Sequence, residues 1–370
     1  MERLQHLQPA RNTMQHDAEL AAWIKLSLTP GLGGQSLRKL LSSFGLPQRV
    51  LAAGRSALTG VVSAELATRI LSDLDSAAVD AALEWAAVEG HAVLTLADGD
   101  YPQSLLETPD PPALLYLRGR RELLARPGLA VVGSRNATPQ GISNAEQFAR
   151  TFSCAGLTIV SGLALGIDAA AHRGGLDGPG ATIAVLGTGA DILYPQRNRA
   201  LGERIAHEGL IVSEFPLGTP PHGSNFPRRN RVISGLARGC LVVEAALASG
   251  SLITARLAAE QGREVFAIPG SIHSPHSKGC HALIKQGAKL VESAQDLLQE
   301  LGVEALAAPS ATVAAPGTGL LAHLGYDACD IDTLCVRSGL TADAVSAMLL
   351  QLELDGRVAS LPGGLYQRTS

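Results

Sequence analysis

The sequence predicts an α/β protein: a doubly wound parallel sheet, with a small helical domain before it and a winged helix after it. Three observations predict this architecture. Short apolar segments rich in β-branched residues recur between residues 91 and 302, as is typical of strands buried on both faces. Loops rich in Gly, Ser and Thr follow most of these segments. The intervals between the segments are long enough for the crossover helices that parallel strands require.

The first domain, residues 1–90, is predicted to be helical. Within it, LTPGLGGQSLRKLLSSFG (28–45) places a glycine turn before apolar residues at helical spacing, Leu37, Leu40, Leu41 and Phe44. The segment resembles a helix-hairpin-helix element, whose turn offers backbone N–H groups to a DNA phosphate. A helical turn in a small interaction bundle explains the same pattern, so both interpretations stay open at this point.

The second domain, residues 91–302, contains the predicted sheet. Two early segments, HAVLTLADGDYP (91–102) and PALLYLRG (112–119), are expected to add an edge hairpin or extra strands. The main strands are expected at LAVVG (129–133), LTIVSG (157–162), TIAVLG (182–187), LIVSE (210–214), CLVVEA (240–245), EVFAIPG (264–270) and KLVES (289–293).

A linker rich in Ala, Pro, Ser and Thr is predicted at 303–317, and a winged helix at 318–370. A short apolar helix, a helix and turn (DIDTLCVRSGL), a second helix that begins near Thr341 and a hairpin wing (VASLPGGLYQR) follow one another. The second helix is poor in Arg and Lys and ends with Glu353 and Asp355. Its composition favours a protein-contact or structural role over the reading of DNA.

The composition indicates a globular chain with a slightly negative overall charge. Of its 370 residues, 46% are hydrophobic and 17% charged, and the formal net charge is −4. No apolar run reaches the roughly 18–20 residues that span a bilayer, and the N-terminal segment lacks a signal-peptide core, so we expect a cytoplasmic location. The five cysteines show no C-x-x-C spacing and are expected to be reduced thiols. A nucleic acid would have to bind at a local basic patch.

The loops after the predicted strands are the expected ligand sites, because ligands of doubly wound sheets bind at the carboxyl ends of the strands. Backbone N–H groups in Gly- and Ser-rich loops can approach an anion closely. A nucleotide cofactor is not expected. GTGADI (187–192) lacks the third glycine of G-x-G-x-x-G and carries Asp191 where a pyrophosphate would lie, and the chain has no G-K-[ST] loop.

A basic segment, NFPRRNRVISGLARG (225–239), contains four arginines and no carboxylate. Pro227 is expected to be the first residue of a helix over 227–237, because its missing N–H is not needed there. On this helix Arg228 and Arg231 share a face and are expected to meet a ligand phosphate. The buried face is expected to consist of Val232, Ile233 and Leu236.

Arg229 falls within the buried face of this helix. We therefore expect a structural ion pair between Arg229 and one of three carboxylates, Asp168, Glu214 or Glu244. Arg135, in GSRN directly after a predicted strand, is the other expected phosphate contact. Two separate basic groups suit an extended phosphate chain better than a single phosphate.

The sequence shows no catalytic or metal-binding constellation. His172 follows IDAAA on a predicted helix and is expected to be structural, as a cap or as a partner of Asp168. Ser161 is not in a G-x-S-x-G elbow, and no two histidines have metal-ligand spacing. We therefore expect a binding protein and not an enzyme.

Taken together, these loops resemble the DNA-processing protein A (DprA/Smf) family. The helical N-terminal region, which resembles a SAM-like domain, and the winged helix fit the same family. The motifs that carry the resemblance occur in order: VVGSR (131–135), SGLALGIDAAAH (161–172), VLGTG (185–189), YP (194–195), SEFP (213–216), NFPRRNRVISGL (225–236), VVEA with SGSLITA (242–255), GREVFAIPG (262–270) and GCHALIKQGA (279–288).

The resemblance implies an extended Rossmann-like fold and a homodimer. It implies a non-enzymatic single-stranded-DNA-binding recombination mediator that protects incoming strands and loads RecA on them during natural transformation. No cofactor, metal or membrane is implied, and double-stranded DNA is a second candidate ligand. The implied DNA contacts are Ser134, Arg135, Ser161, Gly162, Gly166, Arg228, Asn230, Arg231 and Lys278, with structural support from Asp168, Arg229 and Glu244. One departure is His281 in GCHALI, near Lys278, where the family pattern has Asn.

Two other functions stay open. SGSLITA (249–255) and the glycine loops are distantly similar to nucleoside-monophosphate phosphoribohydrolases, although the paired glycines and closely following acids of those enzymes are missing. A regulator that binds double-stranded DNA through its winged helix is the other alternative. Release of free base from AMP would favour the enzyme, and loss of all DNA binding on deletion of 318–370 would favour the regulator.

Overall fold

The computed structural model describes residues 8–72, 76–303 and 319–369. Apart from Val303, the predicted linker at 303–317 lies outside the described residues. The chain forms two compact units, each assembled from distant parts of the sequence. Unit 1 combines residues 1–125 with 183–236, and unit 2 combines 126–182 with 237–370.

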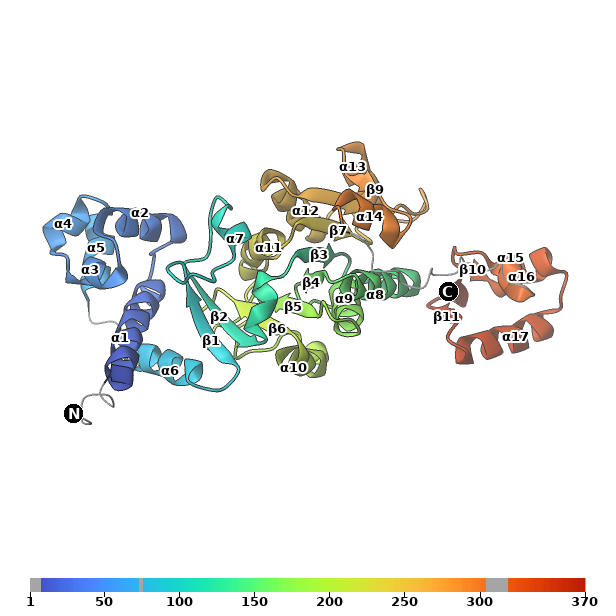
Figure 1. Ribbon diagram of the computed structural model, residues 1–370. Helices are drawn as coiled ribbons and strands as arrows, with labels where there is room; N and C mark the ends of the chain where they lie inside the picture. The colour runs from blue at the N-terminus through green and yellow to red at the C-terminus, as the bar shows by residue number, and fades with distance from the viewer. Residues whose placement is uncertain (1–7, 73–75, 304–318, 370) are drawn as a thin grey trace. The chain divides into compact units, whose positions relative to one another are not determined.

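A mixed sheet of nine strands has the order β1-β2-β6-β5-β4-β3-β7-β8-β9 (Figure 1). Each predicted strand segment forms a strand of this sheet. Neighbouring strands are often distant in sequence, as in the doubly wound fold that the sequence predicts. The strands are β1 (His91–Thr95), β2 (Leu114–Gly119), β3 (Gly128–Val132), β4 (Thr158–Ser161), β5 (Thr182–Val185), β6 (Leu210–Ser213), β7 (Gly239–Val242), β8 (Glu264–Ala267) and β9 (Lys289–Leu290).

Unit 1 begins with the predicted helical region and continues into an antiparallel hairpin. Strands β1 and β2 pair with His91 opposite Arg118, β2 is antiparallel to β6, and β6 is parallel to β5. Leu26, Leu40 and Leu58 belong to the buried core of the N-terminal helices. The helices of unit 1 are α1 (Gln8–Leu28), α2 (Gly34–Phe44), α3 (Pro47–Ala52), α4 (Arg55–Thr59), α5 (Ala64–Leu71), α6 (Ser76–Ala86), α7 (Gln103–Leu106), α10 (Arg199–Glu208) and α11 (Asn225–Gly235), with short 3₁₀ turns at Arg121–Ala125 and Gln196–Asn198.

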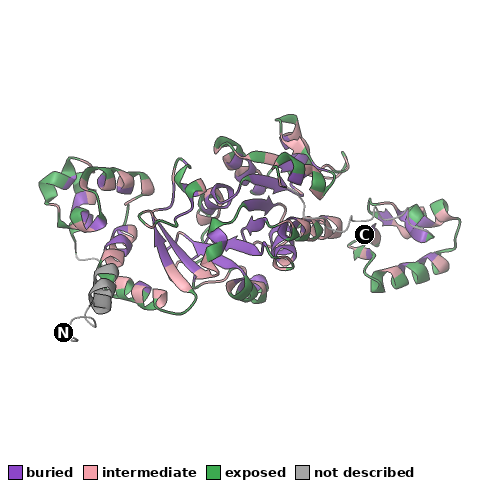
Figure 2. Ribbon diagram, in the orientation of Figure 1, coloured by how far each residue is buried: buried purple, intermediate pink, exposed green. Residues whose placement is uncertain are grey.

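Unit 2 contains the purely parallel part of the sheet, β4-β3-β7-β8-β9. Strands β3, β4 and β7 are buried along their whole length, as the purple strands in Figure 2 show. Helices α8 and α9 pack closely because Gly174 has no side chain: a Cβ there would lie 2.0 Å from the Glu146 carbonyl oxygen. The helices beside this part of the sheet are α8 (Pro139–Cys154), α9 (Ile167–Leu176), α12 (Ser251–Glu260), α13 (Lys278–Lys285) and α14 (Ala294–Glu300).

The C-terminal domain is a winged helix, as predicted. Its core holds Leu320, Leu334 and Val345, and Thr341 caps α17 by accepting a hydrogen bond from the Ala344 N–H. The elements are α15 (Leu320–Leu324), β10 (Cys329–Asp330), α16 (Ile331–Ser338), α17 (Ala342–Leu354), β11 (Val358–Leu361) and β12 (Leu365–Arg368). Within the described ranges no single helix is long and apolar enough to span a membrane, although α16 and α17 together, as a bent pair, meet the criteria of length and composition.

Candidate nucleic-acid interface

The arginine helix α11 lies at the carboxyl end of β5. The Arg229 guanidinium donates to the carbonyl oxygen of Val185, the last residue of β5, and Asn225 Nδ2 donates to the Gly187 carbonyl oxygen at 3.1 Å. The helix starts at Asn225 and not at Pro227 as predicted. Pro227 is thus its third residue, where an N–H still has no partner within the helix, so proline is tolerated there.

Arg229 is buried, with 5% of its surface exposed, which confirms the predicted inward orientation. Besides Val185, its guanidinium donates to Asn230 Oδ1 at 3.2 Å, so Asn230 also belongs to this internal network. Two of the three predicted carboxylate partners are bound elsewhere: Glu214 pairs with Arg228 and Arg231, and Glu244 accepts hydrogen bonds from Thr138. The pairing of Arg229 with Asp168 stays a prediction.

Arg228 and Arg231 share one face of α11, as predicted, but they have different environments. Both pair with the same oxygen of Glu214, the residue after β6. The Arg228 side chain is 56% exposed, whereas that of Arg231 is 14% exposed and also contacts Asp110. The two arginines predicted to meet a ligand therefore differ in accessibility: the Arg228 side chain is exposed, whereas that of Arg231 is largely buried beside Glu214. Contact of either arginine with a ligand stays a prediction.

Glu214 was predicted only as a possible partner of Arg229, and its ion pairs with Arg228 and Arg231, which form the arginine cluster of unit 1, were not predicted. Its side chain is 4% exposed, and its Oε1 is buried without a hydrogen-bond partner among the described residues. Burial raises the pKa of Glu214, and this effect outweighs the opposing influence of the Arg231 and Arg228 guanidinium groups. The cluster thus contains a carboxylate whose charged form is poorly stabilised.

Asp110 connects the cluster to the N-terminal helices. Its carboxylate accepts a hydrogen bond from Arg38 on α2 at 2.8 Å and lies 3.4 Å from Arg231 Nε. Arg38 also donates to the carbonyl oxygens of Pro109 and Pro111. Within unit 1, α2 is therefore joined to α11 by a chain of alternating charges.

Aromatic rings lie beside the accessible arginine. The Arg228 guanidinium carbon is 5.4 Å from the centre of the Phe215 ring, a cation–π contact. The rings of Tyr194 and Phe226 are stacked with centroids 5.9 Å apart, and Tyr194 is 44% exposed. Tyr194 was not predicted as a site residue, although the YP motif (194–195) marks its position.

In unit 2, the loops after β3 and β4 are in direct contact. Gly166 has φ of +75°, and a Cβ there would lie 2.3 Å from the Ser134 carbonyl oxygen. The Ser134 carbonyl oxygen accepts a hydrogen bond from the Ile167 N–H at 3.1 Å, while the Ser134 N–H donates to the Glu244 carbonyl oxygen at 2.7 Å. This packing presents Arg135 at the surface, and its predicted contact with a phosphate stays a prediction.

Ser161 and Gly162, predicted as DNA contacts, are used inside unit 2. The Ser161 hydroxyl is fully buried and donates to the Val131 carbonyl oxygen at 2.7 Å. The Gly162 and Ala164 N–H groups donate to the Asp168 carboxylate at 3.1 and 3.4 Å. Asp168 therefore lies where the prediction put an external anion, and it supports the loop instead.

His172 completes the support of the loop after β4. Its Nε2 accepts a hydrogen bond from the Leu163 N–H at 3.1 Å, and its Nδ1 lies 2.8 Å from the Thr182 hydroxyl. Because Nε2 is an acceptor, we assign the ring proton to Nδ1, which donates to Thr182. Both ring nitrogens are engaged in a buried network, as befits the predicted structural role. No described group of three or more His, Cys, Asp or Glu residues is placed to hold a metal ion.

The remaining predicted residues of unit 2 lie near the ends of β7 and β8. Glu244 binds the start of α8 through Thr138. Lys278 is exposed at the start of α13, and its ammonium group donates to the Ile272 carbonyl oxygen. His281, the departure from the family pattern, has its Nε2 3.0 Å from the Gly270 carbonyl oxygen.

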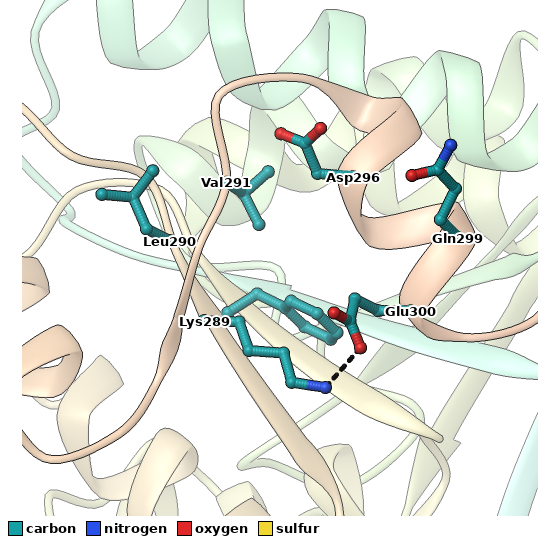
Figure 3. A pocket seen from close by; sticks show the side chains of 7 residues that line it. Lys289, Leu290, Val291, Asp296, Gln299 and Glu300 are labelled. Carbon is teal, nitrogen blue, oxygen red and sulfur yellow. Dashed lines mark hydrogen bonds and ion pairs between the residues drawn. The ribbon is translucent and has the colours of Figure 1, made fainter.

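A cavity of about 350 Å³ near β9 is a poor site for an anion (Figure 3). Its lysine, Lys289, is paired with Glu300 at 2.5 Å and with Glu264 at 3.2 Å. Asp296 also lines it. The acidic lining would repel a phosphate, so this cavity is not part of the candidate interface.

Known proteins resemble the chain over both its sheet and its C-terminal domain. The family model for DNA recombination-mediator protein A matches residues 92–302, and the DprA winged helix domain matches 303–364. Protein Smf of Escherichia coli is 44% identical over 77% of this chain and 80% of its own length.

Two solved structures extend the comparison. The X-ray structure of DprA from Streptococcus pneumoniae is 41% identical, with a TM-score of 0.67 over 75% of this chain and 95% of that one. DprA from Helicobacter pylori, whose structure is described as revealing a single-stranded DNA binding mode, is 32% identical, with a TM-score of 0.52 over 56% of this chain and 95% of that one. On these grounds, and with the fold that the resemblance implied, the chain belongs to the DNA recombination-mediator protein A family.

Proposed function

We propose that this chain binds single-stranded DNA and acts as a non-enzymatic recombination mediator. The observation that carries the proposal is the accessible Arg228 guanidinium, which lies over the Phe215 ring. Arg228 and Phe226 are on the same helix, α11. An exposed arginine attracts backbone phosphates, and an aromatic pair such as Tyr194 and Phe226 offers a surface on which bases stack. The single-strand binding described for the relative from Helicobacter pylori supports the same reading.

In unit 2, the proposed contacts are Arg135 and Lys278, both exposed and basic. Ser134 and Gly166 shape the loop that carries Arg135, and we infer a positioning role for them. We leave Ser161 and Gly162 out of the contact set, because their polar groups are bonded inside the unit. Binding through phosphates and stacking is expected to depend strongly on salt and weakly on sequence.

We further infer a homodimer located in the cytoplasm, which protects incoming strands and loads RecA on them during natural transformation. These inferences rest on the family resemblance. A reconstituted strand-exchange reaction tests them: the protein is expected to allow RecA to assemble on a strand already covered by single-strand-binding protein. A protein that binds the strand but never accelerates this assembly would contradict the mediator role.

Binding of a fluorescein-labelled oligo-dT, followed by fluorescence anisotropy, tests the first proposal directly. We expect saturable binding, and we expect a duplex of the same length to be a poor competitor.

Incubation with AMP and other nucleoside monophosphates, with chromatography for free base, tests the enzymatic alternative. Robust release of free base would contradict the proposal that the protein is not an enzyme.

A further inference from the structure

The arginine cluster of unit 1 contains almost as much negative as positive charge. Arg228, Arg231 and Arg38 are connected through two carboxylates, Glu214 and Asp110. Three positive and two negative charges leave a net charge of +1 for the cluster. Because Glu214 accounts for one of the two negative charges, its ionisation state decides whether a phosphate at Arg228 meets a net charge of +1 or +2.

We propose that Glu214 is a resident counter-ion of this cluster. While Glu214 is charged, it weakens the binding of a DNA phosphate by Arg228, and when Glu214 is neutralised, that binding becomes stronger. The inference rests on the proposed function, because it concerns the strength of single-strand binding at the same arginine. Glu214 acts through Arg228 and is therefore a positioning and charge-setting residue.

The geometry places Glu214 where it competes with a phosphate. Its Oε2 is 3.1 Å from the Arg228 terminal nitrogen and also accepts from Arg231. Glu214 and the Phe215 ring are the partners of the Arg228 guanidinium among the described residues, so its other N–H groups are available at the surface. A phosphate that binds these groups shares one guanidinium with the carboxylate, and the two like charges repel each other.

The environment of Glu214 makes neutralisation accessible. A buried carboxylate with one unpaired oxygen is unfavourable in its charged form. The burial-driven rise of its pKa, against Arg231 and Arg228, means that protonation occurs under milder acid than for an exposed Glu. The other ionisable groups that face it are Asp110 and the hydrogen-bonded Tyr101.

The charge of Glu214 determines whether the affinity for a single strand rises or falls with pH. As pH falls through the pKa of Glu214, the cluster gains positive charge, so the affinity for a single strand is expected to rise. Glu214→Gln keeps the shape of the side chain and removes its charge at every pH. The variant is therefore expected to bind more tightly than the parent at high pH and to respond less to acidification.

The experiment measures binding of fluorescein-labelled oligo-dT to the full chain from about pH 8 down to the most acidic pH at which circular dichroism shows the native fold, a range in which histidines also titrate. Those histidines are present in both proteins, so the difference between the two pH profiles reports on Glu214. We expect Glu214→Gln to bind roughly three- to ten-fold more tightly at the higher pH. The log–log salt dependence should become steeper by up to about 0.7.

Glu203→Gln is the matched control, because Glu203 lies on α10 and pairs with Arg118 at the surface, not with an arginine of α11. It is expected to leave affinity and salt dependence unchanged. A folded Glu214→Gln variant whose affinity is unchanged or weaker, or whose pH profile equals that of the parent, would overturn the proposal.

Two further measurements keep the proposal falsifiable if Glu214→Gln fails to fold. Acidification should tighten binding of the parent, and it should do so less in Arg228→Ala, since Glu214 acts through Arg228. An equal gain in both proteins contradicts the inference. A parent that does not bind oligo-dT refutes the proposed function itself, whereas binding that needs Arg228 but ignores Glu214 refutes this inference alone.

Discussion

Thr138 donates two hydrogen bonds to the carboxylate of Glu244, which lies just after the carboxyl end of β7. The Thr138 hydroxyl donates to Glu244 Oε1 at 2.6 Å, and the Thr138 N–H donates to Oε2 at 2.9 Å. The Thr138 oxygen in turn accepts from the Gly141 N–H and caps α8. One carboxylate therefore fixes the start of α8, which follows the loop that presents Arg135.

Gly141→Ala is expected to destabilise the protein, opposite to the usual effect of alanine in a helix. A Cβ at Gly141 would lie 2.3 Å from the Glu244 carboxyl carbon. Alanine normally stabilises a helix interior by about 1 kcal/mol relative to glycine, but overpacking costs about 1–3 kcal/mol. Urea unfolding should show a lower midpoint. Gly99→Ala, where the added Cβ meets open space, is the control and should change little; a stabilised Gly141→Ala would mean that Glu244 moves freely.

Arg228→Ala is expected to weaken single-strand binding without harming the fold. The side chain is 56% exposed, so its removal deletes a phosphate contact and leaves the core intact. We expect a roughly three- to ten-fold loss of affinity for all sequences and a salt slope reduced by up to about 0.7. Fluorescence anisotropy with oligo-dT over a salt series measures both quantities.

Arg204→Ala is the matched control for Arg228→Ala. Arg204 is an exposed arginine on α10 that also pairs with a glutamate, Glu208. Its replacement should leave affinity and slope as they are. If the two variants lose affinity equally, Arg228 has no specific role and the positive charge of the surface as a whole explains the binding.

Arg229→Ala is expected to change stability more than binding. Arg229 is buried and donates to the Val185 carbonyl oxygen at the end of β5. Its removal leaves an unpaired acceptor and a void, which together cost about 2–4 kcal/mol. Thermal unfolding followed by circular dichroism should show a lower Tm, while the salt slope of oligo-dT binding stays near that of the parent. The reverse pattern, with an unchanged Tm and a reduced slope, would show that Arg229 contacts the strand.

The strands were predictable because each one carries its own local signal. Segments such as LAVVG are apolar throughout and end at glycine, and they form strands wherever both faces of a sheet are covered. The inward position of Arg229 followed from helical geometry in the same way. The exact start of α11 did not, because a proline is tolerated at several positions of the first turn.

The ion network around α11 was not predictable from local patterns. Arg231 is bound by Asp110, which lies 121 residues earlier in the chain. Which carboxylate meets which arginine depends on how the parts of unit 1 pack, and spacing along the sequence does not record it. The same holds for the loop after β4, where Asp168 and His172 take the N–H groups that were expected to meet a phosphate.

Deletion of the winged helix is expected to leave single-strand binding intact. The described domain, 319–369, has six carboxylates and three arginines, a net charge of −3. Helix α17, in the place of a recognition helix, has no Arg or Lys. Its Leu350 and Leu354 are 59% and 75% exposed. An acidic domain with an apolar outer helix face is unsuited to a DNA groove.

The deletion removes 318–370 and is assayed with oligo-dT and with a duplex of equal length. Since the Ser143 hydroxyl donates to the Thr369 carbonyl oxygen at 2.9 Å, circular dichroism must first show that the shortened chain keeps its fold. We expect the shortened, folded chain to bind oligo-dT with the affinity of the full chain, and its binding to the duplex to be unchanged. Loss of all DNA binding would instead place recognition in the winged helix and favour the regulator. Arg228→Ala in the shortened chain should weaken binding by the same factor as in the full chain, because the contact lies in unit 1.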